Sequence, residues 1–136
     1  MELTNQNGNA TGTGGPRNDR CILIVDDDRD FLKLLCLCLT MDGFKVTWAE
    51  SGNEALALMK VKHFAFMLTD YSMLGMDGLK LSDEALKIIP GLSIVILTGN
   101  PSTQLYHYAS VLGIRAVLVK PLDVKELLKI INGRSR

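Results

Sequence analysis

Five short apolar stretches recur along the chain, and each is followed by a stretch whose apolar residues have helical spacing. Most of the apolar stretches run without alternation, which is typical of strands buried on both faces of a sheet. The predicted strands are residues 21–25, 44–48, 64–69, 93–98 and 115–119. The predicted helices are residues 29–41, 55–61, 79–89, 101–112 and 124–131. This alternation predicts an α/β fold with a parallel sheet covered by helices on both faces.

Start signals and apolar spacing refine the helices. Ser51 and Glu54 match a capping box, Asp123 is a candidate N-cap of the last helix, and Asn100–Pro101 predicts a cap followed by proline at the first helical position. Apolar spacing predicts one core-facing stripe on each helix. For the first and fourth helices the expected stripes are Phe31, Leu34, Leu35 and Cys38, and Leu105, Tyr108, Ala109 and Leu112.

Length and composition are those of one globular domain. The chain has 136 residues, of which 47% are hydrophobic and 22% charged, and this is enough apolar material for one core. Residues 1–19 contain one leucine and no aromatic residue. Such a segment cannot bury enough apolar surface to offset its ordering entropy. We therefore expect a disordered N-terminal tail over residues 1–19 and one domain over residues 20–136.

Charge and hydropathy argue against several partners. The chain has 15 basic and 15 acidic residues, so no net positive charge attracts nucleic acid or an anionic membrane. No apolar run reaches roughly 18 residues, the length of a membrane span, and the N-terminus lacks the features of a signal peptide. The three cysteines, an odd number, predict no disulfide framework. We expect a cytoplasmic protein that binds neither nucleic acid nor a membrane.

Polar residues gather where four of the predicted strands end. Three aspartates follow the first strand, at 26–28, and Asp70 follows the third. The fourth strand ends in Thr98 and the fifth is followed by Lys120. All strands of a parallel sheet end at the same edge, where open α/β sheets form their sites. One acid at a strand end is often only a helix cap, as Asp28 can be, but four converging strand ends predict a site.

The chemistry of this group points to a cation and a phosphoryl group. Crowded carboxylates repel one another unless a cation neutralises them, and hard oxygen ligands suit Mg²⁺. A metal beside a carboxylate can stabilise the charge of a phosphoryl group during transfer. Lysine supplies a point positive charge for phosphoryl oxygens, and a threonine hydroxyl can donate a hydrogen bond to them.

Four motifs together resemble the receiver domain of two-component response regulators, over residues 21–132. They are ILIVDDD, TDYSMLGMDG, ILTG and VKPL. The resemblance implies a flavodoxin-like (βα)5 fold, doubly wound, with a parallel sheet of strand order 2-1-3-4-5. It also implies that Asp70 is the phosphoacceptor. Asp26 and Asp27 would hold Mg²⁺ with Asp70 and the backbone carbonyl of Ser72.

The remaining motif residues carry the other implied roles, and two positions depart from the family pattern. By resemblance, Thr98 is the switch hydroxyl, Lys120 binds the phosphoryl group, and Gly99 leaves room for its entry. Leu74 stands where the family usually has proline. Val117 stands where it usually has the tyrosine or phenylalanine whose rotamer couples to the threonine. A valine has no ring to swing, so the readout of phosphorylation is expected to differ.

The expected function is a phosphorelay switch and not a metabolic enzyme. A histidine kinase or a histidine phosphotransfer protein would donate the phosphoryl group to Asp70. The domain would catalyse part of the transfer and its own dephosphorylation. Sixteen residues follow Lys120, so we expect a stand-alone receiver. It would signal through the face from the fourth strand to the last helix, to an unknown output protein or a second copy of the chain.

Two other functions stay open on the sequence. Leu74 and Val117 favour a degenerate receiver that acts as a phosphorylation-independent binding scaffold, whereas the complete set of site residues argues against it. ILIVDDD also has acids at i and i+2 after a strand, as in the haloacid dehalogenases. In such a small Mg²⁺-dependent phosphatase the nucleophile would be Asp26, and Asp70 would have no role.

Overall fold

A computed structural model describes residues 19–133, so the expected N-terminal tail lies, apart from Asp19, outside the described residues. All five predicted strands and all five predicted helices are present. The strands are β1 (Cys21–Val25), β2 (Lys45–Ala49), β3 (Phe66–Asp70), β4 (Ser93–Thr98) and β5 (Ala116–Val119). The helices are α1 (Arg29–Met41), α2 (Gly52–Met59), α3 (Gly78–Ile88), α4 (Thr103–Leu112) and α5 (Val124–Asn132).

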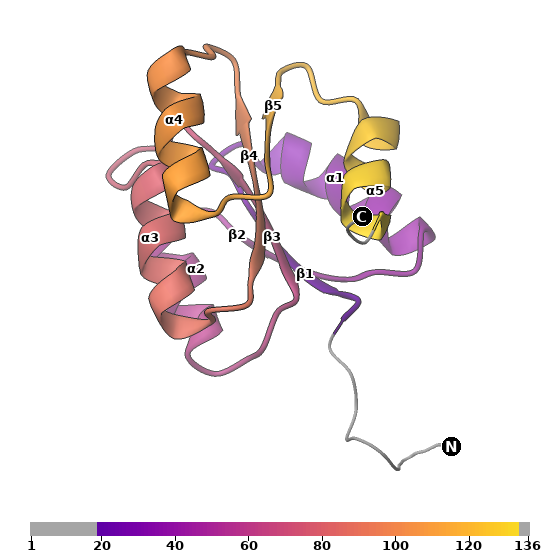
Figure 1. The fold of residues 1–136 in the computed structure, drawn as a ribbon. Coiled ribbons are helices and arrows are strands. Elements are labelled where there is room, and N and C mark those ends of the chain that lie inside the picture. The colour runs from indigo at the N-terminus through magenta and orange to yellow at the C-terminus, as the bar shows by residue number, and fades with distance from the viewer. Residues whose placement is uncertain (1–18, 134–136) are drawn as a thin grey trace.

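The strands form one parallel sheet in the order β2-β1-β3-β4-β5. Helices α1 and α5 cover one face, and α2, α3 and α4 lie on the other (Figure 1). The expected doubly wound fold and strand order are therefore confirmed. All five strands run the same way, so their carboxyl ends meet at one edge of the sheet.

Two apolar clusters, one on each face of the sheet, explain the unalternating strands. Every residue of β1 is buried. Leu23 and Val25 belong to the cluster under α2 and α3, whereas Ile22 and Ile24 belong to the cluster under α1 and α5. Because successive side chains of a strand point to opposite faces, a central strand needs apolar residues at every position.

Three expected helix starts are confirmed by side-chain caps. Ser51 caps α2 by accepting from the Glu54 amide at 3.1 Å. Asp123 caps α5, and Asp28 caps α1 through the Asp30 and Phe31 amides. Asp28 therefore plays the helix-cap role that the sequence left open, because its side chain satisfies amides that have no intrahelical partner.

The expected core face of α1 is wrong in part. The buried residues are Leu32, Leu35 and Leu39, whereas Leu34 is 62% exposed and Phe31 and Cys38 are partly exposed. The helix carries leucine at positions 32, 34, 35, 37 and 39. With apolar residues around most of its circumference, spacing alone allows more than one stripe, and packing against the sheet selects one of them.

The expected start and stripe of α4 are also wrong in part. The helix begins at Thr103, and its N-cap is Ser102, whose hydroxyl oxygen accepts from the Leu105 amide at 3.0 Å. A serine cap satisfies that amide, so neither Asn100 nor Pro101 is needed for helix initiation. Leu105 and Ala109 are buried, but Tyr108 is 51% exposed. The pair at i and i+4 sets the buried face, and Tyr108 lies about 100° from Ala109 around the helix.

Within residues 19–133, none of the helices is both long enough and apolar enough to cross a membrane.

The α1 correction predicts a difference between two neighbouring leucines. Leu39 is fully buried, and Leu37 is 58% exposed. We expect Leu39→Ala to lower the free energy of unfolding by about 2–5 kcal/mol. Leu37→Ala should change it by no more than about 0.5 kcal/mol. Urea denaturation of both variants measures these values, and equal losses would contradict the assigned face.

Candidate functional site

Asp70 is the last residue of β3, and the sheet fixes its position. In the parallel ladder with β4 it is paired with Leu97, and the next amide, of Tyr71, donates to the Leu97 carbonyl at 2.8 Å. Asp70 is 5% exposed. By strand alternation its side chain shares the α1–α5 face of the sheet with Leu68. The strand is therefore a rigid mount for a buried carboxylate.

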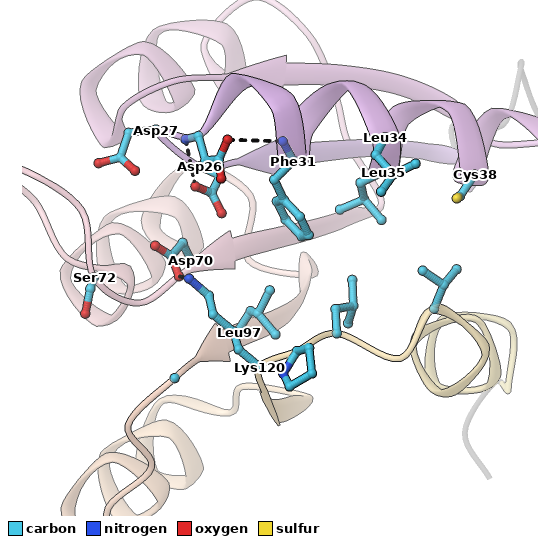
Figure 2. Close-up of a pocket in the computed structure, with 15 residues that line it drawn as sticks. Asp26, Asp27, Phe31, Leu34, Leu35, Cys38, Asp70, Ser72, Leu97 and Lys120 are labelled. Carbon is cyan, nitrogen blue, oxygen red and sulfur yellow. Dashed lines mark hydrogen bonds and ion pairs between the residues drawn. The ribbon is translucent and has the colours of Figure 1, made fainter.

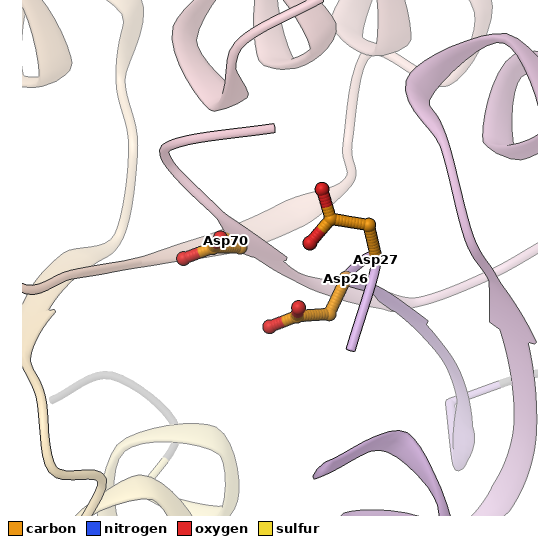
Figure 3. A group of neighbouring side chains, drawn as sticks. All are labelled: Asp26, Asp27 and Asp70. Atoms are coloured by element: carbon orange, nitrogen blue, oxygen red, sulfur yellow. The ribbon is translucent and has the colours of Figure 1, made fainter. Parts of the chain in front are cut away.

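Asp26 and Asp27 continue directly from β1. The Asp26 amide donates to the Ala49 carbonyl at 3.1 Å, which extends the ladder with β2 by one residue. Asp26 is buried and Asp27 is exposed. Carboxylate oxygens of Asp26, Asp27 and Asp70 all lie within 4.8 Å of one another, and Figure 3 shows the three side chains together at the strand ends. The fold therefore brings the predicted acids into one acidic group.

Lys120, which follows β5, reaches the same group (Figure 2). Its Nζ atom lies 2.8 Å from Oδ1 of Asp70. Its amide donates to the Thr98 carbonyl at 2.8 Å, so the chain remains tied to β4 at this point. The peptide bond to Pro121 is cis. Lys120 thus provides a positive charge at the buried carboxylate that the sequence assigns as the phosphoacceptor.

Burial and mutual repulsion shape the electrostatics of the site. Burial raises the pKa of Asp26, and the nearby charges of Asp70 and Asp27 act in the same direction. The Asp28 amide, which donates to Asp26 Oδ1 at 2.9 Å, opposes this rise in pKa. For Lys120, burial lowers the pKa, but contact with Asp70 and the other acids outweighs it and the pKa is raised. With three carboxylates and only the Lys120 ammonium to balance them, the group keeps an excess of negative charge.

The donor set fits a hard divalent cation. Among the described residues, Asp70 Oδ1 is a buried oxygen without a hydrogen bond of good geometry, although Lys120 is near. A buried acceptor of this kind normally has a partner. Converging carboxylate oxygens are the ligands that Mg²⁺ and Ca²⁺ prefer. Asp27 is exposed at the rim of the group, so an ion can enter from solvent.

An open hollow of about 940 Å³ adjoins the acids and has two unlike ends (Figure 2). Ser72 and Gly99 line the polar end beside Asp70 and Lys120. The apolar end is formed by Phe31, Leu34, Leu35, Cys38, Leu97, Pro121, Leu122 and Val124. Sequence reasoning missed this apolar end because it assigned Phe31, Leu34 and Cys38 to the core. The first helix has more apolar residues than one buried stripe can hold, and this surplus was the signal in the sequence that some of them line a surface hollow.

The Thr98 hydroxyl has a backbone partner outside the acidic group. Thr98 is buried at the end of β4 and is not among the residues that line the hollow. Its hydroxyl oxygen accepts from the Asn100 amide at 3.1 Å. By strand alternation it follows Ile96, on the face of the sheet covered by α2 and α3.

The two positions that depart from the family pattern lie in different surroundings. Val117 is half-buried and packs against the apolar cluster under α2 and α3. Leu74 is 89% exposed in the loop between β3 and α3. Neither residue lines the hollow. Both substitutions therefore leave the acidic group itself intact.

A family model and many known proteins match this chain. The model described as "Response regulator receiver domain" matches residues 22–132. The transcriptional regulatory protein GlrR of Escherichia coli is 38% identical over 111 residues, 82% of this chain and 25% of GlrR. The response regulator receiver protein CpdR of Brucella abortus is 32% identical over 107 residues, 79% of this chain and 89% of CpdR. The chain thus spans about a quarter of some relatives and most of others.

Solved structures show the same fold. A CheY-like response regulator receiver domain protein from Methanospirillum hungatei superimposes with a TM-score of 0.81 at 30% identity, covering 85% of this chain and 92% of that one. A response regulator protein from Burkholderia pseudomallei, described with a phosphorylated aspartic acid, calcium ion and citrate, superimposes with a TM-score of 0.77 at 28% identity. The superposition covers 82% of this chain and 66% of that one.

The raised pKa of Asp26 predicts how stability depends on pH. An acid whose pKa is raised by folding binds protons more tightly in the folded state, so its ionisation destabilises the fold as pH rises above 3.8, its ordinary value. In the presence of a chelator at pH 7, Asp26→Asn should therefore have a higher Tm than the wild type. The asparagine oxygen can still accept from the Asp28 amide.

Thermal unfolding between pH 4 and pH 7 measures this difference, which should narrow as the pH falls. Asp27→Asn is the matched control, because it removes an exposed carboxylate of the same group. A lower Tm for Asp26→Asn than for the wild type at pH 7 would contradict the assigned cause.

Proposed function

The chain belongs to the family of response regulator receiver domains, and on this basis we propose that it is a phosphorylation switch with Asp70 as phosphoacceptor. Receiver domains are signalling switches and not metabolic enzymes. The observation that carries the assignment is the buried Asp70 carboxylate, which lies within 4.8 Å of two further acids and 2.8 Å from Lys120. The proposed phosphodonor is a histidine kinase or a histidine phosphotransfer protein.

The proposed step transfers a phosphoryl group from a nitrogen to an oxygen. A carboxylate oxygen of Asp70 bonds to the phosphorus of a phosphohistidine while the phosphorus–nitrogen bond breaks, and the electron pair stays on the imidazole nitrogen. The sheet holds the nucleophile in place at the end of β3, which supplies the positioning part of catalysis. Lys120 holds an oxygen of the incoming group by its charge.

We assign Asp26, Asp27, Asp70 and the backbone carbonyl of Ser72 as the residues that hold Mg²⁺. When bound, the cation neutralises the carboxylates and stabilises the charge of the transferring group. Asp26 and Asp27 bring two carboxylates from β1 beside the nucleophile. A response regulator of this fold from Burkholderia pseudomallei is described with a phosphorylated aspartic acid and a calcium ion, which supports an aspartate phosphoacceptor and a divalent cation in this family.

Four further aspects of the function are proposals of the same kind. Thr98 is the switch hydroxyl and Gly99 leaves the entrance open; a Cβ at Gly99 would be 3.8 Å from Lys120 Cδ, an ordinary contact. The output surface is the face from β4 to α5, and it binds another protein or a second copy of the chain. The location is the cytoplasm, which the free thiols of Cys36 and Cys38 support.

The first test is the intact mass after incubation with acetyl phosphate, with and without Mg²⁺. We expect the gain of one phosphoryl group, which requires Mg²⁺ and is absent from Asp70→Asn. Asp30→Asn, which removes an exposed acid in the first turn of α1, is the control and should be phosphorylated like the wild type. A phosphatase with Asp26 as nucleophile would instead lose incorporation in Asp26→Asn and retain it in Asp70→Asn. No gain in the wild type, also with candidate kinases, would leave the scaffold function.

Substitution of Lys120 should affect the rate of phosphorylation and the affinity for Mg²⁺ differently. Lys120→Ala removes the ammonium that compensates charge at Asp70, so the rate of phosphorylation by acetyl phosphate should fall by about a hundredfold. The same change makes the pocket more negative and frees Asp70 Oδ1. Affinity for Mg²⁺, measured by titration calorimetry, should therefore stay equal or increase. A parallel loss of rate and of Mg²⁺ affinity would mean that Lys120 only maintains the shape of the site.

A further inference from the structure

Gly78, the first residue of α3, lies in unusually close contact with the backbone of Asp70. A Cβ atom at Gly78 would lie 2.7 Å from the Asp70 carbonyl oxygen and 3.0 Å from Cα of Tyr71. Both partners are backbone atoms, which cannot rotate away as a side chain can. Only glycine therefore allows α3 to approach the end of β3 this closely.

Both backbone polar groups of Gly78 have hydrogen-bond partners, one of them at the end of β3. Its amide donates to the Tyr71 carbonyl at 2.8 Å. Its carbonyl accepts from the buried hydroxyl of Ser82 at 2.7 Å. Asp77 caps the helix by accepting from the Lys80 amide at 2.8 Å. The Ser82 and Asp77 bonds hold the first turn of α3 together, and the Gly78–Tyr71 bond joins this turn to the end of β3, so α3 cannot move away from β3 without losing that bond.

This contact acts on the residues that build the proposed site. Tyr71 is held on one side by the Leu97 carbonyl, which accepts from its amide, and on the other by Gly78. Asp70 precedes Tyr71 and Ser72 follows it. The two bonds therefore fix the backbone between the proposed nucleophile and the proposed carbonyl ligand of the cation.

We propose that Gly78 is a positioning residue, which sets the place of the Asp70 carboxylate and the Ser72 carbonyl by letting α3 press on the end of β3. The inference rests on the proposed function of Asp70. Functional groups must be held within about 0.5 Å of their productive geometry. A methyl group at Gly78 forces a shift of the Asp70–Tyr71 backbone, because 2.7 Å is shorter than real Cβ contacts.

Gly52 provides a matched control within the same chain. It is the first residue of α2, as Gly78 is of α3, and both are buried. A Cβ at Gly52 would also meet close neighbours, but all of them are side-chain atoms of Met76: Sδ at 2.8 Å, Cβ at 3.1 Å and Cγ at 3.3 Å. Methionine has three rotatable side-chain bonds and adapts to new packing. Gly52→Ala therefore introduces the same methyl group at the same helix position without forcing the backbone of Asp70 to shift.

The experiment compares Gly78→Ala and Gly52→Ala with the wild type in three measurements. These are the amide NMR shifts of Tyr71 and Ser72 without metal, the Kd for Mg²⁺, and the rate of phosphorylation by acetyl phosphate at saturating Mg²⁺. For Gly78→Ala we expect displaced amide shifts, a higher Kd and a rate about tenfold to a hundredfold lower. Gly52→Ala should match the wild type in all three, even where its Tm falls equally.

The outcomes separate this inference from the proposed function. Wild-type amide shifts, Kd and rate in a folded Gly78→Ala variant would overturn the positioning role. If the wild type itself gains no phosphoryl group, the proposed function fails, while the amide shifts and the Kd still test the positioning. If Gly78→Ala does not fold in buffer, all three proteins are measured in trimethylamine N-oxide, an osmolyte that favours the folded state. A lower rate and a higher Kd for Gly78→Ala than for Gly52→Ala in the same solution would then support the role, and a wild-type rate and Kd would overturn it.

Discussion

The buried carboxylate of Asp70 is the constraint on which the rest of the site depends. Burying an ionised group is costly unless it is paired. Lys120 provides the pairing charge at 2.8 Å, but Asp26 and Asp27 bring two more acids to the same place. One ammonium cannot balance three carboxylates, so the pocket retains an excess of negative charge. A divalent cation relieves that repulsion. The same excess of negative charge therefore governs both cation binding and the reactivity of Asp70.

Such repulsion can be maintained only on a rigid support. The central strands are buried on both faces, so a shift of one residue in register would move apolar side chains of both clusters to the wrong face. The acids therefore stay close to one another although their charges favour separation. The Lys120 amide donates to β4, and Gly78 at the start of α3 lies in close contact with the Asp70 backbone. The stability of the sheet thus offsets the repulsion between the carboxylates at its edge.

The sequence predicted what depends on local pattern and on topology. Strands without alternation, caps such as Ser51 and Asp123, and acids at strand ends led to the fold and to the acidic group. Prediction failed where tertiary packing decides among equal local choices. In α1, leucines around most of the helix hid the buried stripe and with it the apolar end of the hollow. In α4, Asn100–Pro101 gave a start signal, but the side chain that caps the helix is that of Ser102. The close approach of Gly78 to Asp70 depends on two elements meeting in space, and a DG dipeptide reads as an ordinary helix start.

Val117 and Thr98 together limit how a phosphoryl group on Asp70 can be sensed. An aromatic side chain at position 117 could report the event by changing its rotamer, but Val117 has no ring and packs against the cluster under α2 and α3. The Thr98 hydroxyl accepts from the Asn100 amide, two residues before the Ser102 cap of α4. If Thr98 turns toward a phosphoryl group, the Asn100 amide must follow or lose its partner. In the proposed switch the signal therefore passes through the backbone of residues 99–102 to the start of α4, and not through a side chain of β5.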